Sequence, residues 1–105
     1  MKYWDVTFIP EAEKDRAKLE ISARNQVDKA IRKVSQNPLP KNEGGYGNPL
    51  GNKRGKNLTG LLKIKLKKLG IRVVYDLIRE KETMRIIVIS IRADNEVYKI
   101  ADSRV

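Results

Sequence analysis

Residues 61–78 read LLKIKLKKLGIRVVYDLI, and their pattern predicts the central part of the fold. Apolar residues alternate with lysines as far as Lys68, and a second segment, Ile71–Ile78, follows Gly70. A period of two is the pattern of a half-buried β-strand, and glycine suits the turn between two strands. The stretch therefore predicts an antiparallel pair of strands with one apolar face and one basic face.

The same pattern predicts how the two strands pair. With an even number of loop residues centred on 69–70, Lys67 pairs with Arg72 and Ile64 with Tyr75. Apolar residues then face apolar residues, whereas a slip by one residue would turn the lysines into the core. We therefore expect one face of this hairpin to carry four cations, namely Lys63, Lys65, Lys67 and Arg72.

The flanking segments predict the other elements. Alternation predicts a strand over residues 3–9, and residues 84–92 are nearly all apolar, as in a strand covered on both faces. Pro10 and the acidic residues after it predict a short helix to about residue 19. Ser22 is expected to cap a second helix, whose apolar stripe has the helical period. Residues 95–101 predict a closing helix.

The chain of 105 residues is expected to form one domain, residues 1–105, of the α+β class. The expected order is an N-terminal strand, a two-helix hairpin, an antiparallel sheet of about four strands and a short C-terminal helix. Arg92 ends the last of the predicted strands and is expected to reach the basic face of the hairpin.

Residues 37–60 differ in composition from the rest of the chain. They hold six of the seven glycines and three of the four prolines, which predicts a long basic loop. Loops of this length are uncommon in compact domains. Two interpretations are open: a tolerated insertion, or a flap that faces the substrate.

Positive charge is concentrated in one window. Residues 44–75 contain no acidic side chain and eight of the 23 Lys and Arg residues, so they carry +8 of the net charge of +10. Charge focused in this way favours a polyanionic partner, most often nucleic acid. The eight bases are Lys53, Arg54, Lys56, Lys63, Lys65, Lys67, Lys68 and Arg72.

Absent residue types narrow the chemistry. The chain has no cysteine and no histidine, which excludes disulfides, a thiolate nucleophile and the usual acid–base residue near neutral pH. Proton transfer must use Tyr, Lys, Asp, Glu or a group of the substrate, and we expect no cofactor or metal. No segment is typical of a signal peptide or a membrane span, so we expect a soluble cytoplasmic protein without a membrane partner.

Clustered cations suit metal-free cleavage of RNA. Attack of the 2′-hydroxyl on the adjacent phosphorus needs a base, cations that hold the charge on the phosphorane oxygens, and an acid for the 5′ leaving oxygen. Arginine makes forked contacts with phosphate, and crowding among lysines favours the neutral, basic form of one amine. Tyr98 could act as acid or base, or stack on a nucleobase. The plain alternative is a solvated strand face that protects a sheet edge from aggregation.

Several short motifs resemble the RelE/ParE toxin superfamily in order and spacing. Together they run over nearly the whole chain: Phe8-Ile9-Pro10-Glu11-Ala12, Leu58-Thr59-Gly60, Lys63-Ile64-Lys65-Leu66, Gly70-Ile71-Arg72-Val73-Val74-Tyr75, Ile89-Ser90-Ile91-Arg92 and Asn95-Glu96-Val97-Tyr98. The resemblance implies the RelE-like, microbial-ribonuclease-like fold. The RelE branch implies the toxin of a type II toxin–antitoxin system, a ribosome-dependent mRNA endonuclease (mRNA interferase) that inhibits translation and has a cognate antitoxin as partner.

The resemblance also implies site residues. Lys65 is expected to be the base, Arg92 the acid or a stabiliser of the transition state, and Tyr98 to orient the substrate base. The implied catalytic set is Lys63, Lys65, Arg72, Arg92 and Tyr98. Further contacts with RNA are expected from Lys53, Arg54, Lys56, Lys67 and Lys68.

Two other functions are open at this point. A ParE-like protein would share the fold but inhibit DNA gyrase, although the presence of Lys63, Lys65 and Tyr98 favours the RelE branch. A non-catalytic basic RNA-binding module would need the charge of residues 44–75 but no particular residue at Arg92 or Tyr98.

Overall fold

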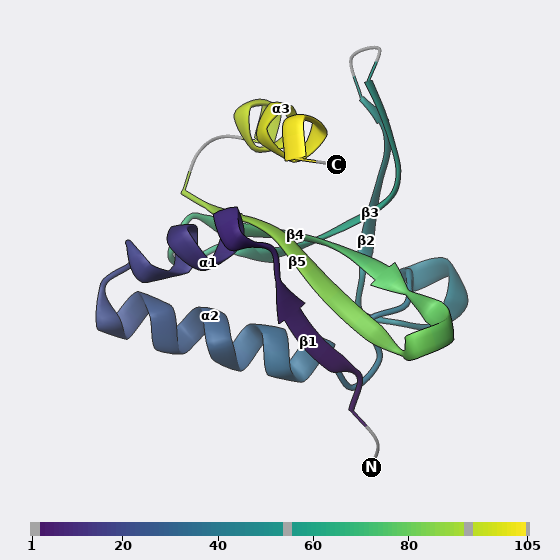
Figure 1. Cartoon of the computed structure of the whole chain (residues 1–105), viewed down its shortest axis with the longest axis horizontal. Helices are drawn as coiled ribbons and strands as arrows, with labels where there is room; N and C mark the ends of the chain where they lie inside the picture. Colours follow the sequence, from purple (N-terminus) through teal and green to yellow (C-terminus); the bar gives the residue numbers. More distant parts are fainter. Residues whose placement is uncertain (1–2, 54–55, 92–93, 105) are drawn as a thin grey trace.

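The protein has a five-stranded sheet with helices on both faces (Figure 1). The structure is a computed structural model that describes residues 3–53, 56–91 and 94–104, without the side chains of residues 51–53, 56–59, 94 and 95. Two 3₁₀ helices, Lys41–Glu43 and Arg79–Lys81, join longer elements. Those elements are, in chain order, β1 (Asp5–Phe8), α1 (Pro10–Ala17), α2 (Ile21–Val34), β2 (Asn48–Lys53), β3 (Lys56–Leu66), β4 (Ile71–Ile78), β5 (Thr83–Ser90) and α3 (Asp94–Arg104).

The α+β class is confirmed, but the sheet is larger than expected. Its strand order is β1-β5-β4-β3-β2, and β1 pairs with β5 in parallel whereas all other neighbours are antiparallel. The sheet is therefore mixed and has five strands, where about four antiparallel strands were expected. The chain leaves β1 through α1 and α2 and returns beside it only at β5, a pairing that no local pattern reveals.

Two apolar cores lie on opposite faces of the sheet. The core under α1 and α2 contains Ala12, Val27 and Ile31, and the core under α3 contains Val97 and Ala101. Consecutive residues of β4 and β5 alternate between the two, since Val73 and Ile89 belong to the first core and Val74 and Val88 to the second. This confirms a strand covered on both faces, with bounds Thr83–Ser90 where 84–92 were predicted; Ile91 is outside the strand and exposed, and Arg92 lies outside the described residues.

The helices agree with the sequence pattern except at one cap. α2 buries Val27, Ile31 and Val34, which are members of the predicted stripe. The helix already begins at Ile21, so Ser22 lies inside it and the prediction that Ser22 is the N-cap is wrong. Pro10 opens α1 as expected.

The prediction of a long loop over residues 37–60 is wrong in its second half. Residues 48–53 form β2, and β3 already begins at residue 56, so the two strands make a hairpin that extends beyond the rest of the sheet at the side of α3 (Figure 1). Gly51 pairs with Leu58 despite its low strand propensity, and the register shifts between Pro49 and Gly51. β2 is an edge strand, where proline is tolerated because one side of the strand needs no ladder hydrogen bonds.

The predicted pairing of the central hairpin is wrong by two residues and right in its faces. Lys65, not Lys67, pairs with Arg72, and Ile64 pairs with Val73. The ladder ends at Leu66 because residues 67–70 form the turn, with a hydrogen bond from Gly70 N to Lys67 O (3.3 Å). A shift of two residues leaves every side chain of the paired residues 62–66 and 71–75 on its predicted face, since strand faces repeat with a period of two.

Candidate active site

A row of polar side chains crosses the face of the sheet that α3 partly covers. Lys65 on β3, Arg72 on β4 and Ser90 on β5 are successive cross-strand partners. The next row, Lys63, Val74 and Val88, lies on the same face and continues into the core under α3. The pattern of residues 61–78 therefore brings three of the predicted catalytic cations to one surface.

Tyr98 joins this surface from α3. Its hydroxyl oxygen accepts a hydrogen bond from Lys63 Nζ at 2.9 Å, and the same Nζ lies 5.5 Å from the centre of the Tyr98 ring. The ring packs in the core under α3 and is only 9% exposed. Because Oη accepts from Lys63, the phenol keeps its own proton available for donation to another group.

The three other described members of the row differ in exposure. Lys65 is exposed, and Arg72 is half-buried, with Nη1 donating to Gly70 O at 3.2 Å. Ser90, which sequence reasoning did not select as a site residue, is half-buried beside Arg72. A single serine at a strand end carries no signal in the sequence, so only the cross-strand register identifies it.

Of the other predicted residues, two lie away from this face and four have side chains outside the description. Lys67 and Lys68 lie in the turn after β3, where they line a hollow with Gln26 of α2. Lys53 and Lys56 are partners in the β2–β3 ladder, and their side chains lie outside the description. The prediction that Lys67 shares the face of Lys63 and Lys65 is wrong, because the ladder ends at Leu66 and Lys67 belongs to the turn. Arg54 and Arg92 lie outside the described residues.

Carboxylates of the described region pair with arginines elsewhere. Asp28 pairs with Arg16 and Asp76 with Arg85, each with a shortest N–O distance of 2.6 Å. A hydrogen bond from Arg79 lowers the pKa of Glu43, and the hydrogen bond from Arg85 to Asp76 raises the pKa of that guanidinium. Over residues 3–53, 56–91 and 94–104 no three acidic side chains are gathered as a metal site would require.

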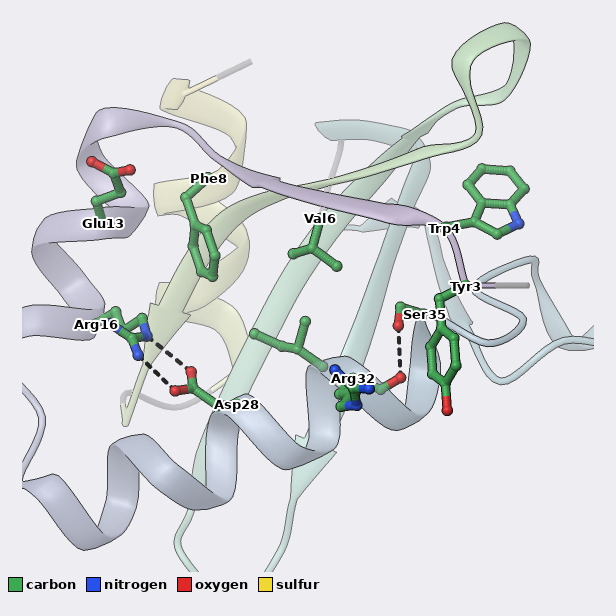
Figure 2. A pocket seen from close by; sticks show the side chains of 10 residues that line it. Tyr3, Trp4, Val6, Phe8, Glu13, Arg16, Asp28, Arg32 and Ser35 are labelled. Carbon is green, nitrogen blue, oxygen red and sulfur yellow. Dashed lines mark hydrogen bonds and ion pairs between the residues drawn. The ribbon is translucent and has the colours of Figure 1, made fainter. Parts of the chain in front are cut away.

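Another hollow, of about 650 Å³, lies on the side of the sheet that α1 and α2 cover, whereas Tyr98 packs on the other side. Figure 2 shows this hollow from close by. It is bordered by Trp4, Val6 and Phe8 and by the Arg16–Asp28 ion pair, which Figure 2 shows as two parallel hydrogen bonds. Its charged side chains are two acidic and two basic, namely Glu13, Asp28, Arg16 and Arg32, so it offers no cluster of like charge to a substrate. None of the helices within the described ranges has the length and apolarity to span a bilayer.

Comparison with known proteins identifies relatives by structure. No protein-family model and no curated protein sequence matches the chain. A variant of the E. coli toxin RelE with two arginines replaced by alanine, in the free state, is 28% identical, with 99% of each chain covered and a TM-score of 0.73. The same variant in complex with a peptide of the antitoxin RelB has a TM-score of 0.71 at 28% identity and the same coverage.

A mycobacterial structure agrees with these matches. The toxin–antitoxin complex RelBE2 from Mycobacterium tuberculosis matches at 25% identity, covering 90% of this chain and 97% of that one, with a TM-score of 0.69. The likeness therefore extends over nearly the whole chain in two organisms.

Proposed function

The chain is a RelE-like toxin of the type II toxin–antitoxin class, and from this premise we propose that it is a ribosome-dependent endoribonuclease that cuts mRNA by attack of a 2′-hydroxyl. The observation that carries the proposal is the hydrogen bond between Lys63 and Tyr98, 35 residues apart in the chain. The plain alternative is a strand face whose lysines are only solvated. A lysine that instead donates to a tyrosine hydroxyl at the border of a basic surface favours a functional site over that alternative.

Each of the four predicted catalytic residues that the structure describes is assigned a role in this reaction. Lys65 is the exposed base that removes the 2′ proton, and Arg72, its cross-strand partner, binds the phosphate and holds the charge of the phosphorane. Lys63 orients the Tyr98 hydroxyl, and Tyr98 positions the substrate base. Arg92 is assigned to the acid or to charge stabilisation on the family resemblance alone.

The proposal includes a cognate antitoxin. The matched structures include RelE in complex with an antitoxin peptide and an intact E. coli RelBE toxin–antitoxin complex, the latter at 27% identity and a TM-score of 0.66. A protein of net charge +10 favours a partner with an acidic segment that covers the basic surface. mRNA and the ribosome complete the set of partners.

The test is cleavage on translating ribosomes. Purified protein is added to a defined translation system and the new mRNA ends are mapped, for the wild type and for the Lys65→Ala and Tyr98→Phe variants. We expect codon-phased cuts with the wild type and a loss of about 100-fold or more in the cleavage rate constant with Lys65→Ala. Lys99→Ala is the matched control, since Lys99 is the exposed neighbour of Tyr98 on α3.

Two results contradict the proposal. One is the absence of new mRNA ends with the wild type, and the other is cleavage by Lys65→Ala at the wild-type rate. Inhibition of DNA supercoiling by gyrase without RNA cleavage would support the ParE-like alternative. Binding of RNA without cleavage, on and off the ribosome, would support a non-catalytic module.

A further inference from the structure

Strand β5 has an open edge next to the candidate active site. β1 pairs with residues 83–86 of β5, and Ile9 N still donates to Ile86 O at 3.1 Å. β5 continues to Ser90, and within the described part of the chain no strand flanks this last section on the side of β1. Its backbone N–H and C=O groups therefore need other partners.

A β-bulge in β5 determines which of its backbone N–H and C=O groups need other hydrogen-bond partners. Val74 pairs with Val88 and Tyr75 with Ile86, so Ile87 is an extra residue without a partner on β4. Such a bulge changes which backbone groups point to each side of a strand. The carbonyl of the bulge residue Ile87 and the N–H of Ile89, two residues later, both form hydrogen bonds with side chains instead of with a neighbouring strand.

One ion pair supplies both partners. Arg104 Nη1 donates to Ile87 O at 2.9 Å and to Asp15 Oδ2 at 2.7 Å, and the same Oδ2 accepts from Ile89 N at 3.1 Å. The four groups form a closed ring at the edge of the strand. Asp15 comes from α1 and Arg104 from the last residue of α3, so the pair ties two helices to β5.

This pair is better buried than the other ion pairs described here. The side chains of Arg104 and Asp15 are 18% and 17% exposed, whereas those of Arg16 and Asp28 are 37% and 39% exposed. Exposed pairs contribute little to stability, but loss of one partner of a buried pair leaves a charge without compensation. The Arg104–Asp15 pair is therefore expected to matter more to the structure than its surface counterparts.

The pair lies at the C-terminal end of α3, whereas the Lys63 contact is made by Tyr98 near the middle of the helix. α3 packs across β3, β4 and β5, and Tyr98 ties it to β3 while Arg104 ties it to β5. Tyr98 and Arg104 are six positions apart, which is about 9 Å along the helix axis and about 120° around it. Two anchors on different sides of a helix fix both its position along the sheet and its rotation about its own axis.

We propose that Asp15 and Arg104 are positioning residues for the active site: their ion pair holds α3 in the rotation that presents the Tyr98 hydroxyl to Lys63 and to RNA. The proposal rests on the proposed ribonuclease function for its catalytic part. Its structural part, the placement of Tyr98, is independent of that function and is measured separately below.

The placement of Tyr98 is tested by NMR of protein labelled with ¹³C in its tyrosine rings. The Tyr98 signals are assigned by their loss in Tyr98→Phe. We expect Arg104→Gln and Asp15→Asn to shift these signals and to broaden them, because α3 gains rotational freedom. Arg16→Gln is the matched control, since Arg16 makes two parallel hydrogen bonds with Asp28 of α2 (Figure 2), and their loss leaves both members of the Asp15–Arg104 pair in place.

A second control is Lys18→Gln. Lys18 lines the same hollow of about 390 Å³ as Asp15 and Arg104, so this variant removes a positive charge from the same place without touching the ring of hydrogen bonds. Unchanged Tyr98 signals in both Arg104→Gln and Asp15→Asn overturn the proposal. So do equal changes in Lys18→Gln. Thermal unfolding of each variant shows that the signals are compared in folded protein.

The catalytic part is tested by a double-mutant cycle on the ribosome. We expect Arg104→Gln to reduce the cleavage rate constant by about 10- to 100-fold, the scale of a misplaced catalytic group. In the Tyr98→Phe background the same change is expected to have little further effect, because it acts through the Tyr98 hydroxyl. An equal fold-loss of the cleavage rate constant in the wild-type and Tyr98→Phe backgrounds overturns the proposal that Arg104 acts through Tyr98. A wild type that does not cleave defeats the proposed function, while the NMR result still decides the placement of Tyr98.

Discussion

At the scale of single residues, Lys63 and Tyr98 contribute different properties to their contact. Tyr98 is held by the core under α3 and has little freedom, whereas Lys63 is half-buried at the border of that core. The hydrogen bond at 2.9 Å therefore joins a nearly buried acceptor to a half-buried donor. Charge-assisted hydrogen bonds of this kind are stronger than neutral ones, so the contact orients the phenol as well as the amine.

A second tyrosine has a structural role. Tyr75 is fully buried, and its hydroxyl donates to Pro38 O at 2.8 Å, which fastens the segment after α2 to β4. Burial raises the pKa of the Tyr75 phenol well above its ordinary value. The folded protein therefore keeps a proton that the unfolded chain releases near pH 10, and the stability linked to it is lost as the pH rises further.

Tyr75→Phe is expected to reduce the free energy of unfolding by roughly 1–3 kcal/mol at pH 7, because it leaves the Pro38 carbonyl without its partner. Above about pH 10 the difference from the wild type is expected to narrow, since only the wild type loses stability through this phenol. Urea unfolding of the wild type and of Tyr75→Phe between pH 7 and 10.5 measures the difference in free energy of unfolding and its change with pH. Tyr46→Phe is the control, because Tyr46 is 47% exposed. A difference that widens with pH contradicts the prediction.

Gly47 is required for close packing against the same tyrosine. A Cβ at this position would lie 2.5 Å from Tyr75 Oη and 2.9 Å from Leu62 Cδ2. We expect Gly47→Ala to destabilise the protein by roughly 1–3 kcal/mol, as overpacking of a core does. In the Tyr75→Phe background the loss is expected to be smaller because one of the two clashes is removed. Additive losses in a denaturation series would show that Tyr75 is not the obstacle.

At the scale of elements, the β3–β4 hairpin determines which side chains reach the active face. Its alternation survives a shift of two residues in register, so Lys63, Lys65 and Arg72 share a face although the pairing differs from the prediction. The length of the turn could not be read from the sequence. Leu69 N donates to Leu66 O at 3.2 Å, so residues that fit a longer ladder close the turn instead.

Gly70 gives a direct test of this turn. Its φ is +66°, and a Cβ there would meet nothing within 4 Å, so the cost of a side chain is one of backbone conformation alone. Gly70→Ala is expected to lower the free energy of unfolding by about 1 kcal/mol, and Gly70→Asn by less, because asparagine tolerates the left-handed region. Cleavage by the folded variants is expected to stay at the wild-type rate. A large loss of activity without a loss of stability would show that the turn itself contacts the substrate.

In the β2–β3 hairpin, amino-acid composition predicts the wrong secondary structure. Glycine and proline between residues 37 and 60 predict a loop, yet the structure pairs this region as strands from residue 48 onward. A strand at the edge of a sheet accepts proline and irregular pairing because it has one neighbour only. Local propensity carries no information on whether a segment will lie at an edge.

At the scale of the whole molecule, the active face with Lys63, Lys65 and Arg72 lies on the side of the sheet that carries α3. The face opposite, under α1 and α2, has its own lysines, among them the exposed Lys29. A comparison of single-charge variants on the two faces therefore separates a specific RNA surface from general attraction to a chain of net charge +10.

RNA binding is expected to weaken with salt in a way that depends on the face. Each phosphate contact contributes about −0.7 to the slope of log K against log salt for a single strand. Lys65→Gln is expected to reduce that slope by about 0.7, and Lys29→Gln to leave it unchanged. Fluorescence anisotropy with a short labelled RNA at several salt concentrations measures both. Equal reductions would indicate that RNA does not select the face of Lys65.

The sequence alone predicted most of the elements and the faces of the central strands, but not β2. A period of 3.6 residues sufficed for α2, a period of two for the common face of Lys63, Lys65 and Arg72, Pro10 with its acidic neighbours for α1, and a continuous apolar run for β5. These are local properties, whereas the contacts between distant groups come from the tertiary structure. The parallel pairing of β1 with β5, the extra residue Ile87 and the Asp15–Arg104 ion pair at the open edge follow from the packing of the whole chain, because contacts across long separations leave no periodic trace in a sequence.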